Sequence, residues 1–303
     1  MSVPVGFLNI YKEKGMTSHD VVARVRRIVG LKKVGHAGTL DPEAEGVLLV
    51  GLGRATKYIS YLEQMDKTYL AQVIFGKSTD TYDITGEIQE ERLSGLTQEA
   101  VEGVLSDFRG DLMQAPPIYS ALKKNGRKLY DYARRGEAVE IEARPITISH
   151  LEVMSWGGLP GEIQIKVICS KGTYIRSLCH DIGRALETPA CMGSLLRQEI
   201  GRFKAVEAIH LDELESTVEK DNLSQALIPP DAVLSHFQTL RATPRGEHFI
   251  RNGNALFQWN AEDDFGQLTQ GEILRIYDRQ GFVGLGQFKE DEEGPRVVPL
   301  KLL

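Results

Sequence analysis

The stretch from Gly35 to Lys57, which reads GHAGTLDPEAEGVLLVGLGRATK, contains the residue whose type and setting best suit catalysis, Asp41. A proline follows Asp41 directly, and an apolar run, Val47 to Val50, comes shortly after it. Proline restricts the preceding residue to extended conformations, and the nearby glycines allow tight turns. A carboxylate on a stiff loop that leads into a buried strand is well placed for catalysis. A lone Asp-Pro pair is more often an ordinary turn, so the surrounding pattern must decide.

A second group of chemically active side chains follows the strand predicted for residues 163–169, where apolar and polar residues alternate. Tyr174 and Arg176 come directly after this strand, and a helix follows them with Leu178, Ile182 and Leu186 on its inner face. Functional residues are often found at such a strand-to-helix junction. Tyr174 and Arg176 are therefore candidate site residues.

The formal net charge of −6 argues at first against a nucleic-acid partner, but the charge is unevenly distributed. Residues 205–238 carry seven acidic residues against one basic residue. Two basic clusters lie earlier in the chain, one of them formed by Arg24, Arg26, Arg27, Lys32 and Lys33. Phosphate binding depends on local patches more than on total charge, so RNA is compatible with this composition. A solvated helix face is the ordinary alternative for either cluster.

The other basic cluster lies in a stretch, residues 113–140, that also contains two adjacent prolines and three tyrosines. This composition is unsuited to a core and favours an exposed loop and amphipathic segment that contacts a nucleic acid. Lys and Arg bind phosphate there, while Tyr can stack on bases. The cluster predicted to contact the RNA backbone consists of Lys123, Lys124, Arg127, Lys128, Arg134 and Arg135.

The remaining pattern predicts alternating strands and helices. A helix begins at Thr17 or Ser18 and another, over residues 97–109, begins at Thr97. The polar segment 78–87 lacks the spacing of a calcium loop, so we expect no metal there. Strands are predicted over residues 6–11, 67–76, 146–148 and 151–153.

The acidic segment 205–238 is helical in pattern and is interpreted as the linker and last helix of a first domain. From residue 239 the chain changes to short strands separated by glycines, which indicates a small β-barrel-like domain. Two domains, 1–238 and 239–303, are therefore predicted.

The composition, with 42% hydrophobic and 26% charged residues, is that of a globular protein. The three cysteines lack CxxC spacing, and we expect them to be reduced and packed in a cytosolic protein. The N-terminus has no apolar core or cleavage site typical of a signal peptide, and no apolar run is long enough to span a membrane. A cytoplasmic location is expected.

Four segments in series resemble the bacterial tRNA pseudouridine-55 synthases, the TruB family. They are the central loop around Asp41, residues 67–86 with their T-D-T-x-D-x-x-G segment, the Pro-Pro insertion of about residues 113–145, and residues 171–178. The family also opens with a strand, a Lys-Pro-x-Gly turn and a helix, although Glu13 stands here in place of the proline. The insertion marks the bacterial enzymes and is missing from their guide-RNA-dependent relatives, so it favours a stand-alone enzyme.

The resemblance implies roles for particular residues. Asp41 matches the catalytic carboxylate, and Arg176 matches the arginine that keeps this carboxylate ionised. Tyr69 matches the aromatic residue that stacks on the target base and assists proton transfer. His36 matches a residue that helps to splay the RNA loop. The remaining pocket positions are Tyr174 and Leu195, with the neighbouring Leu196 as an alternative to Leu195.

The resemblance also implies the fold and the reaction. The fold is α+β, a pseudouridine-synthase mixed sheet with flanking helices and an RNA-binding cleft, followed by a small β-barrel-like domain that resembles the PUA RNA-binding module. The reaction isomerises uridine to pseudouridine at position 55 in the TΨC loop of tRNA, and the target base is flipped into a pocket. The expected partner is the T arm of tRNA, with no obligate protein partner, no cofactor and no metal.

Two other functions fit parts of the pattern. A non-catalytic RNA-binding protein or tRNA-folding chaperone would not need both Asp41 and Arg176. A carboxylate-based hydrolase of the glycosidase kind would need a second carboxylate across the pocket. Glu43 and Glu45 are near Asp41 in sequence, but their setting is typical of a loop surface. The sequence leaves open whether Asp41 adds to the uracil ring, attacks the ribose or removes a sugar proton.

Overall fold

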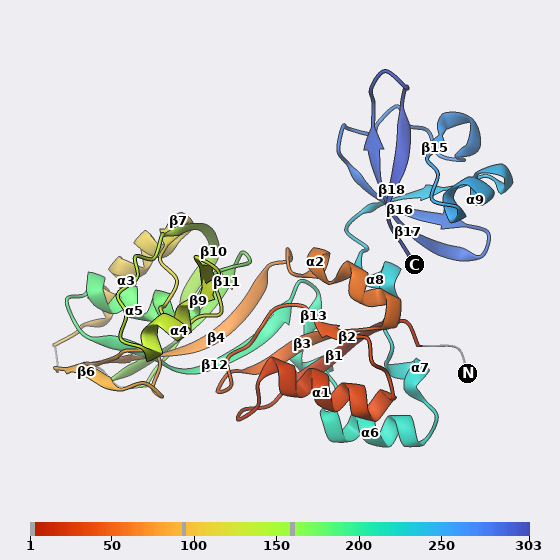
Figure 1. Cartoon of the computed structure of the whole chain (residues 1–303). Helices are drawn as coiled ribbons and strands as arrows, with labels where there is room; N and C mark the ends of the chain where they lie inside the picture. Colours follow the sequence, from red (N-terminus) through yellow and green to blue (C-terminus); the bar gives the residue numbers. More distant parts are fainter. Residues whose placement is uncertain (1–3, 93–94, 158–160) are drawn as a thin grey trace.

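Two long neighbouring strands, β4 (Lys67–Phe75) and β12 (Ala190–Ile200), run through the middle of the molecule and join its two halves (Figure 1). The structure is a computed structural model that describes residues 4–92, 95–157 and 161–303. Within these residues, nine strands form one mixed sheet whose main order is β1-β3-β12-β4-β11-β10-β7. The other strands are β1 (Gly6–Lys12), β2 (Val34–His36), β3 (Glu45–Leu52), β7 (Gly110–Gln114), β10 (Arg144–Trp156), β11 (Glu162–Cys169) and β13 (Phe203–Lys204).

Helices flank both halves of the sheet (Figure 1). Beside β1 and β3 lie α1 (Ser18–Val29) and α6 (Leu211–Glu219), whereas α3 (Gln98–Leu105) and α5 (Ile175–Ala185) cover the half with β10 and β11. The predicted start of α1 is confirmed: the Thr17 side chain accepts a hydrogen bond from the Asp20 amide, and the Asp20 carboxylate accepts one from Thr17. This reciprocal cap satisfies amides that have no partner within the helix.

Shorter elements connect these layers. They are η1 (Gly53–Tyr58), α2 (Ile59–Leu62), the hairpin β5 (Lys77–Thr79) and β6 (Ile88–Glu91), η2 (Ser106–Phe108), the hairpin β8 (Lys123–Lys124) and β9 (Arg127–Lys128), α4 (Leu129–Arg134), η3 (Ala205–Glu207), α7 (Leu223–Ala226) and α8 (Pro230–Val233). The two strands predicted over 146–148 and 151–153 are instead one strand, β10. It passes through the intervening residues by register shifts that still allow pairing with β11.

The acidic segment 205–238 contains helices, as its pattern predicts, and one of them, α6, belongs to a core. Its helix α6 packs on α1, so that Leu211 and Leu214 share a core with Val21 and Val25. Arg24 on α1 forms an ion pair with Asp212 and another, of 3.6 Å, with Glu215. The acidic residues therefore complement part of the first basic cluster.

The C-terminal residues form a separate five-stranded half-barrel in the order β14-β16-β17-β18-β15. Its strands are β14 (Gln238–Arg241), β15 (Leu256–Phe257), β16 (Ile273–Asp278), β17 (Gly281–Lys289) and β18 (Arg296–Leu302), and α9 (Pro244–Arg251) and η4 (Gln258–Asn260) precede and follow β15. The predicted change to short strands is confirmed, whereas α9 was not predicted. The α+β class predicted for the whole chain is confirmed.

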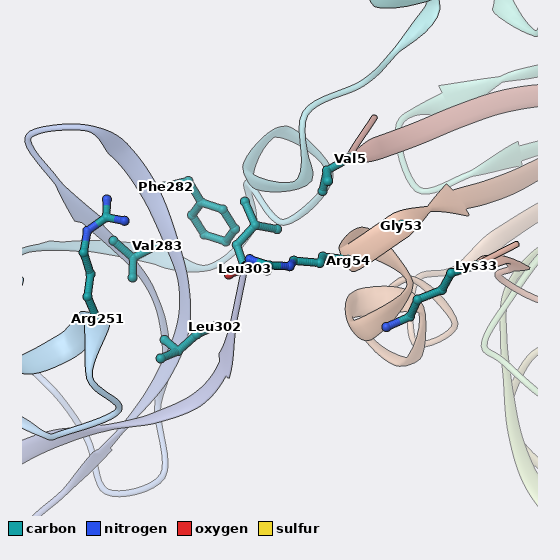
Figure 2. A pocket seen from close by; sticks show the side chains of 9 residues that line it. All are labelled: Val5, Lys33, Gly53, Arg54, Arg251, Phe282, Val283, Leu302 and Leu303. Atoms are coloured by element: carbon teal, nitrogen blue, oxygen red, sulfur yellow. Dashed lines mark hydrogen bonds between the residues drawn. The ribbon is translucent and has the colours of Figure 1, made fainter. Parts of the chain in front are cut away.

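The half-barrel packs against the N-terminal part through a shared core in which Phe282 and Leu285 meet Phe7 and Tyr58. A cavity of about 750 Å³ lies at this junction, and Figure 2 shows the side chains that line it. It is lined by Val5, Lys33, Gly53, Arg54, Arg251, Phe282, Val283, Leu302 and Leu303.

The cysteines Cys169, Cys179 and Cys191 are buried and form no disulfide. None of the helices in the described ranges combines the length and the apolar character that crossing a bilayer requires.

A buried ammonium group at the end of β1 holds the loop that carries Asp41. Lys12 is fully buried, and its Nζ donates to the carbonyl oxygens of Pro42 at 3.0 Å, Ala44 at 2.5 Å and Glu13 at 3.1 Å. Burial lowers the pKa of Lys12 to about 8, against the attraction of Asp41 and Glu43, which raises it.

This shifted pKa makes a testable prediction for stability. Between pH 8 and 10.5 the unfolded chain holds the Lys12 proton that the folded chain has lost, so this group makes stability rise with pH. Relative to Lys12→Met, the wild type should gain roughly 2 kcal/mol in the free energy of unfolding across this window. Urea unfolding at pH 8 and pH 10 measures the gain. Parallel pH dependence of the two proteins would contradict it.

Candidate active site

Asp41 lies on the loop between β2 and β3, which is fastened at several points. The Leu40 amide donates to the Ser18 hydroxyl on α1 at 2.8 Å, and the Gly15 amide donates to the Pro42 carbonyl at 3.0 Å. At the loop's end, Gly46 has φ 106°, and a Cβ there would lie 2.2 Å from the Arg197 carbonyl. Only glycine allows β3 and β12 to approach this closely.

A second buried cation holds the same loop from β12. The Arg197 guanidinium, on a residue only 1% exposed, donates from Nε to the Val47 carbonyl at 2.8 Å and from Nη2 to the Gly38 carbonyl at 3.1 Å. Its Nη1 donates to Thr39 at 3.4 Å. Sequence reasoning gave Arg197 no role. Together with Lys12 it fixes the backbone on both sides of Asp41.

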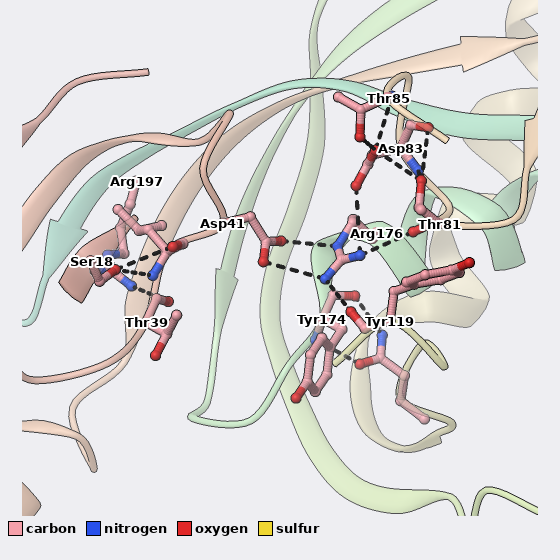
Figure 3. Close-up of polar contacts among 12 residues, drawn as sticks. Ser18, Thr39, Asp41, Thr81, Asp83, Thr85, Tyr119, Tyr174, Arg176 and Arg197 are labelled. Atoms are coloured by element: carbon pink, nitrogen blue, oxygen red, sulfur yellow. Dashed lines mark hydrogen bonds and ion pairs between the residues drawn. The ribbon is translucent and has the colours of Figure 1, made fainter. Parts of the chain in front are cut away.

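The structure brings Asp41 and Arg176 together as an ion pair. Arg176 Nε lies 2.9 Å from Asp41 Oδ2, and Nη2 lies 3.3 Å from Oδ1, so the guanidinium meets both carboxylate oxygens (Figure 3). The Asp41 side chain is 40% exposed, whereas that of Arg176 is 7% exposed. In this pair, the Asp41 carboxylate is accessible to solvent while the Arg176 guanidinium that binds it is buried.

The rest of the Arg176 guanidinium is bound by the segment after β5 and by the start of the insertion. Its Nη1 donates to the Thr81 carbonyl at 3.1 Å and its Nη2 to the Tyr119 carbonyl at 3.0 Å. Asp83 lies 3.6 Å from Nη1 (Figure 3). A planar guanidinium bound along several edges has a fixed orientation, which in turn fixes Asp41.

Asp83 is a site residue to which sequence reasoning assigned no role. Its Oδ1 accepts from the Thr81 hydroxyl at 2.9 Å, and from the Thr85 amide at 3.0 Å and hydroxyl at 2.5 Å. Its side chain is 15% exposed. Asp83 is thus committed to its own turn and to Arg176. The signal that could have identified it is the T-D-T-x-D-x-x-G segment, whose second aspartate is Asp83.

A ring stack supports the same turn. Tyr82 has a left-handed backbone with φ 64°, which is uncommon for a residue other than glycine. Its ring stacks on His180 of α5 with centroids 4.0 Å apart and planes 10° apart. His180 follows Arg176 by four residues and so lies on the same side of α5. One face of α5 therefore contacts the turn twice: Arg176 binds the Thr81 carbonyl, and His180 stacks on the Tyr82 ring.

Tyr69 lies on β4, directly opposite Arg197 of β12 in the sheet register. It is buried in an apolar cluster that includes Leu40 and Ala44 of the Asp41 loop. Burial raises the pKa of Tyr69, and the nearby Arg197 guanidinium partly offsets this. The phenol is therefore neutral at physiological pH.

The register also separates Leu195 from Leu196. Leu195 pairs with Ala71, two residues from Tyr69, so it lies on the same face of the sheet as Tyr69. It is buried in the same cluster as Tyr69. Leu196 faces the other side, which leaves Leu195 as the neighbour of the site.

The other two predicted pocket residues have different surroundings. Tyr174 caps α5, and its backbone exchanges two hydrogen bonds with the Gln114 side chain, of 2.8 and 3.0 Å; Figure 3 shows it beside Arg176. His36, on β2, places its ring edge to face with His19 at 5.4 Å. Burial, and then the nearby His19, lower the pKa of His36. Among the described residues no hydrogen bond links His36 to the Asp41–Arg176 pair.

The six basic residues of the cluster predicted to contact the RNA backbone fall into two sets. Three of them are paired with acids: Lys124 with Glu142 at 3.7 Å, Arg127 with Glu137, and Arg135 with Glu137 at 3.9 Å. The other three, namely Lys123, Lys128 and Arg134, form no ion pair within the described residues. Lys128 and Arg134 instead lie over the Tyr130 ring, at 5.1 and 5.3 Å from its centroid.

Comparison with known proteins identifies the family to which the chain belongs. Residues 26–175 match the N-terminal domain of the TruB family of pseudouridylate synthases, and residues 176–235 match the tRNA pseudouridylate synthase B C-terminal domain. Together they cover most of the chain, and the fold is that of a pseudouridine synthase. The chain belongs to the TruB family.

Relatives from several bacteria match the chain along nearly its full length. A tRNA pseudouridine synthase B from Clostridium perfringens is 44% identical over 300 residues, covering 97% of this chain and 98% of the relative. Another from Heliobacterium mobile is 44% identical over 304 residues, covering 98% and 94%. One from Caldanaerobacter subterraneus is 42% identical over 300 residues, covering 98% of each.

Among solved structures, a crystal structure of a Cbf5-Nop10-Gar1 complex matches with a TM-score of 0.76 at 26% identity, covering 98% of this chain and 84% of that chain. A structure of an H/ACA RNP bound to a substrate RNA containing 2′-deoxyuridine matches with a TM-score of 0.75 at 24% identity, covering 98% and 84%. The second likeness concerns the fold alone.

The role given to Arg197 can be tested through stability. Arg197→Met leaves the carbonyls of Gly38, Thr39 and Val47 without their donors, and it should lower the free energy of unfolding by about 3 kcal/mol. Arg202→Met is the matched control, because Arg202 is exposed and donates to one carbonyl, and it should change the value by about 0.5 kcal/mol or less. Chemical unfolding measures both. Equal losses of stability in the two variants would refute the role of Arg197 in holding the Asp41 loop.

Proposed function

We propose that this chain isomerises uridine to pseudouridine in tRNA, at position 55 of the TΨC loop, with Asp41 as the catalytic carboxylate. The observation that carries the proposal is the ion pair between the exposed Asp41 and the buried Arg176. Family membership and the relatives named tRNA pseudouridine synthase B support the reaction and the substrate.

The chemistry conserves all groups of the nucleotide apart from one exchangeable proton. The bond from the ribose to the base nitrogen breaks, the uracil rotates, and a bond forms from the ribose to C5 of the base. The proton on C5 leaves to solvent and the nitrogen gains one. No redox or group transfer takes place, so the reaction requires no cofactor.

Asp41 has the attributes that this chemistry needs. The Arg176 guanidinium contacts both oxygens of the Asp41 carboxylate and orients them, and the loop held by Lys12 and Arg197 restricts the position of this carboxylate. An ionised carboxylate beside the ribose and base can act as a nucleophile or as a proton acceptor. All three routes, namely ring addition, attack on the ribose and removal of a sugar proton, begin from this state.

The target uridine is stacked inside a folded loop and must be extruded to reach Asp41. We assign Tyr69 to stacking on the flipped base, and Leu195 and Tyr174 to lining its pocket. Their support is position: Tyr69 and Leu195 share the apolar cluster that includes residues of the Asp41 loop. His36, at the start of this loop, is assigned to splaying the RNA.

The partner is the T arm of tRNA, bound by the insertion at about residues 113–145 and by a PUA-like domain at residues 239–303, with the catalytic domain at residues 1–238. The enzyme acts in the cytoplasm without an obligate protein partner. The insertion, which marks the stand-alone enzymes, supports this assignment.

The two competing functions find little support in the geometry. A hydrolase needs a free second carboxylate, but Asp83, which shares Arg176, is mostly buried and hydrogen-bonded within its own turn. A protein that only binds RNA has no use for an exposed carboxylate on a buried guanidinium, because this carboxylate repels phosphate.

Replacement of the proposed catalytic group should separate chemistry from binding. Asp41→Asn should abolish pseudouridine formation, because the amide is neither a nucleophile nor a base, while the Kd for tRNA stays within about threefold. Tritium release from tRNA labelled at C5 of uridine measures turnover. Asp66→Asn, on an exposed loop, serves as the control and should turn over normally. Full turnover by Asp41→Asn would refute the assignment.

The division of the basic cluster gives a second prediction. A variant with Lys123, Lys128 and Arg134 changed to Gln should bind tRNA more weakly and with a flatter dependence of log K on log salt, by up to about 0.9 for each phosphate that is no longer neutralised. The matched variant changes Lys124, Arg127 and Arg135 to Gln. The matched variant should have the smaller effect, because its three cations already pair with acids.

Binding titrations from low to high salt give the slopes of both variants. An unchanged slope in the variant that lacks Lys123, Lys128 and Arg134 would show that these three residues do not contact phosphate.

A further inference from the structure

An exposed aromatic cluster lies in the C-terminal half-barrel, outside the site described above. Trp259, in the short helix η4, is 53% exposed. The ring of Phe257 is nearly parallel to it, with planes 8° apart and centroids 6.2 Å apart, and Phe249 of α9 meets it edge to face at 5.4 Å. The Arg245 guanidinium lies 4.6 Å from the Trp259 ring centroid. What distinguishes Trp259 from the other exposed apolar residues is that two more rings and a guanidinium lie against it.

The backbone beneath the cluster is rigid. Asn260 is fully buried, and its Oδ1 accepts from the Phe257 amide at 2.7 Å, which closes the turn that carries Trp259. The Thr243 hydroxyl donates to the Asn260 carbonyl at 3.1 Å. Gly246 lets α9 lie against this turn, because a Cβ there would be 2.1 Å from the same carbonyl. The rings are therefore held in place before any ligand binds, which reduces the entropy cost of binding.

The cation over the indole is uncommitted. Arg245 forms no ion pair with any residue in the described part of the chain, whereas its neighbours are neutralised: Arg251 by Asp278 and Arg279 by Glu247. A free guanidinium beside an exposed ring can bind a phosphate while the ring stacks on the attached base.

We propose that Trp259 and Arg245 form a stacking site for an unpaired base of single-stranded RNA and its phosphate. The proposal deepens the proposed function, since it adds a second contact with the RNA substrate and rests on RNA being the partner. A protein partner is less suited to this surface. Protein interfaces need a wider apolar core, whereas Gln258 and His248, the sequence neighbours of Trp259 and Phe249, are polar and exposed.

The position of the cluster makes this contact distinct from base isomerisation. Figure 1 shows α9 and β15 on the outer side of the half-barrel, away from the long strands β4 and β12 that carry the candidate active site. An RNA bound at Asp41 would reach Trp259 only with a part of the molecule well away from its target uridine. Loss of the stacking site should therefore weaken binding of a long RNA and leave the chemical step intact.

Intrinsic fluorescence provides a direct test, because the chain contains two tryptophans, Trp156 and Trp259. In the Trp156→Phe protein all indole emission comes from Trp259, and stacking of a base quenches it. The probes are single-stranded hexaadenylate, an RNA duplex of the same length and a full tRNA transcript. We expect saturable quenching by hexaadenylate and none by the duplex, whose bases are already stacked. Unchanged emission with both hexaadenylate and tRNA would overturn the proposal.

Affinity measurements complete the test. Trp259→Ala should weaken hexaadenylate binding by about tenfold, measured by anisotropy of a labelled probe, whereas Trp259→Phe keeps a ring and should lose much less. Leu300→Ala, which removes another exposed apolar side chain of the half-barrel, is the matched control. Wild-type affinity in Trp259→Ala would refute the stacking site. The single-turnover rate of tritium release at a saturating concentration of the T-arm hairpin should be normal in Trp259→Ala, because this rate reports the chemical step and not RNA binding. A loss of hexaadenylate binding is therefore separate from the role of Asp41.

Discussion

The structure depends on one ion pair that joins distant parts of the chain. Asp41 comes from the loop before β3, and Arg176 comes from the start of α5 after β11, on the other half of the sheet. Because Arg176 is mostly buried, its guanidinium must be bound on every side, and two backbone carbonyls and Asp83 complete its shell. The insertion contributes one of these carbonyls, from Tyr119, so the proposed RNA-contacting segment also touches the cation beside the carboxylate.

The second constraint is the rigidity of the Asp41 loop. Lys12 and Arg197 are buried cations whose hydrogen bonds go to loop and strand carbonyls instead of carboxylates. Burying a charge without a counter-ion is costly, and the lowered pKa of Lys12 reflects this cost. The arrangement holds the backbone without placing a further carboxylate beside Arg176, which already pairs with Asp41 and Asp83.

The sequence predicted the parts of this site that leave a local signal. Thr17 and Asp20 form the expected helix cap, the apolar run after Asp41 is a buried strand, and the strand-to-helix junction places Arg176 at the start of a helix. The roles of Asp41 and Arg176 came from family resemblance, because neither spacing nor composition shows that residues 135 positions apart are in contact.

What the sequence did not reveal depends on tertiary packing. Arg197 lies in a strand whose pattern gives no hint that its side chain is buried and bound to carbonyls. Asp83 looked like a turn residue because its partner is far away in the chain. The acidic pattern predicts a linker and a last helix, but only the packed structure shows Leu211 and Leu214 in a core and Arg24 beside two of its acids. Charge patterning alone likewise did not show that half of the six basic residues predicted to contact RNA are already paired with acids.

The central claim is that Arg176 makes Asp41 catalytically competent by fixing its position and orientation. The most direct measurement is the single-turnover rate of pseudouridine formation by Arg176→Met at saturating tRNA, together with the Kd for tRNA. We expect a rate at least about 100-fold lower with a Kd near that of the wild type, because a small displacement of a catalytic group is enough for such a loss. A rate close to that of the wild type would contradict the claim.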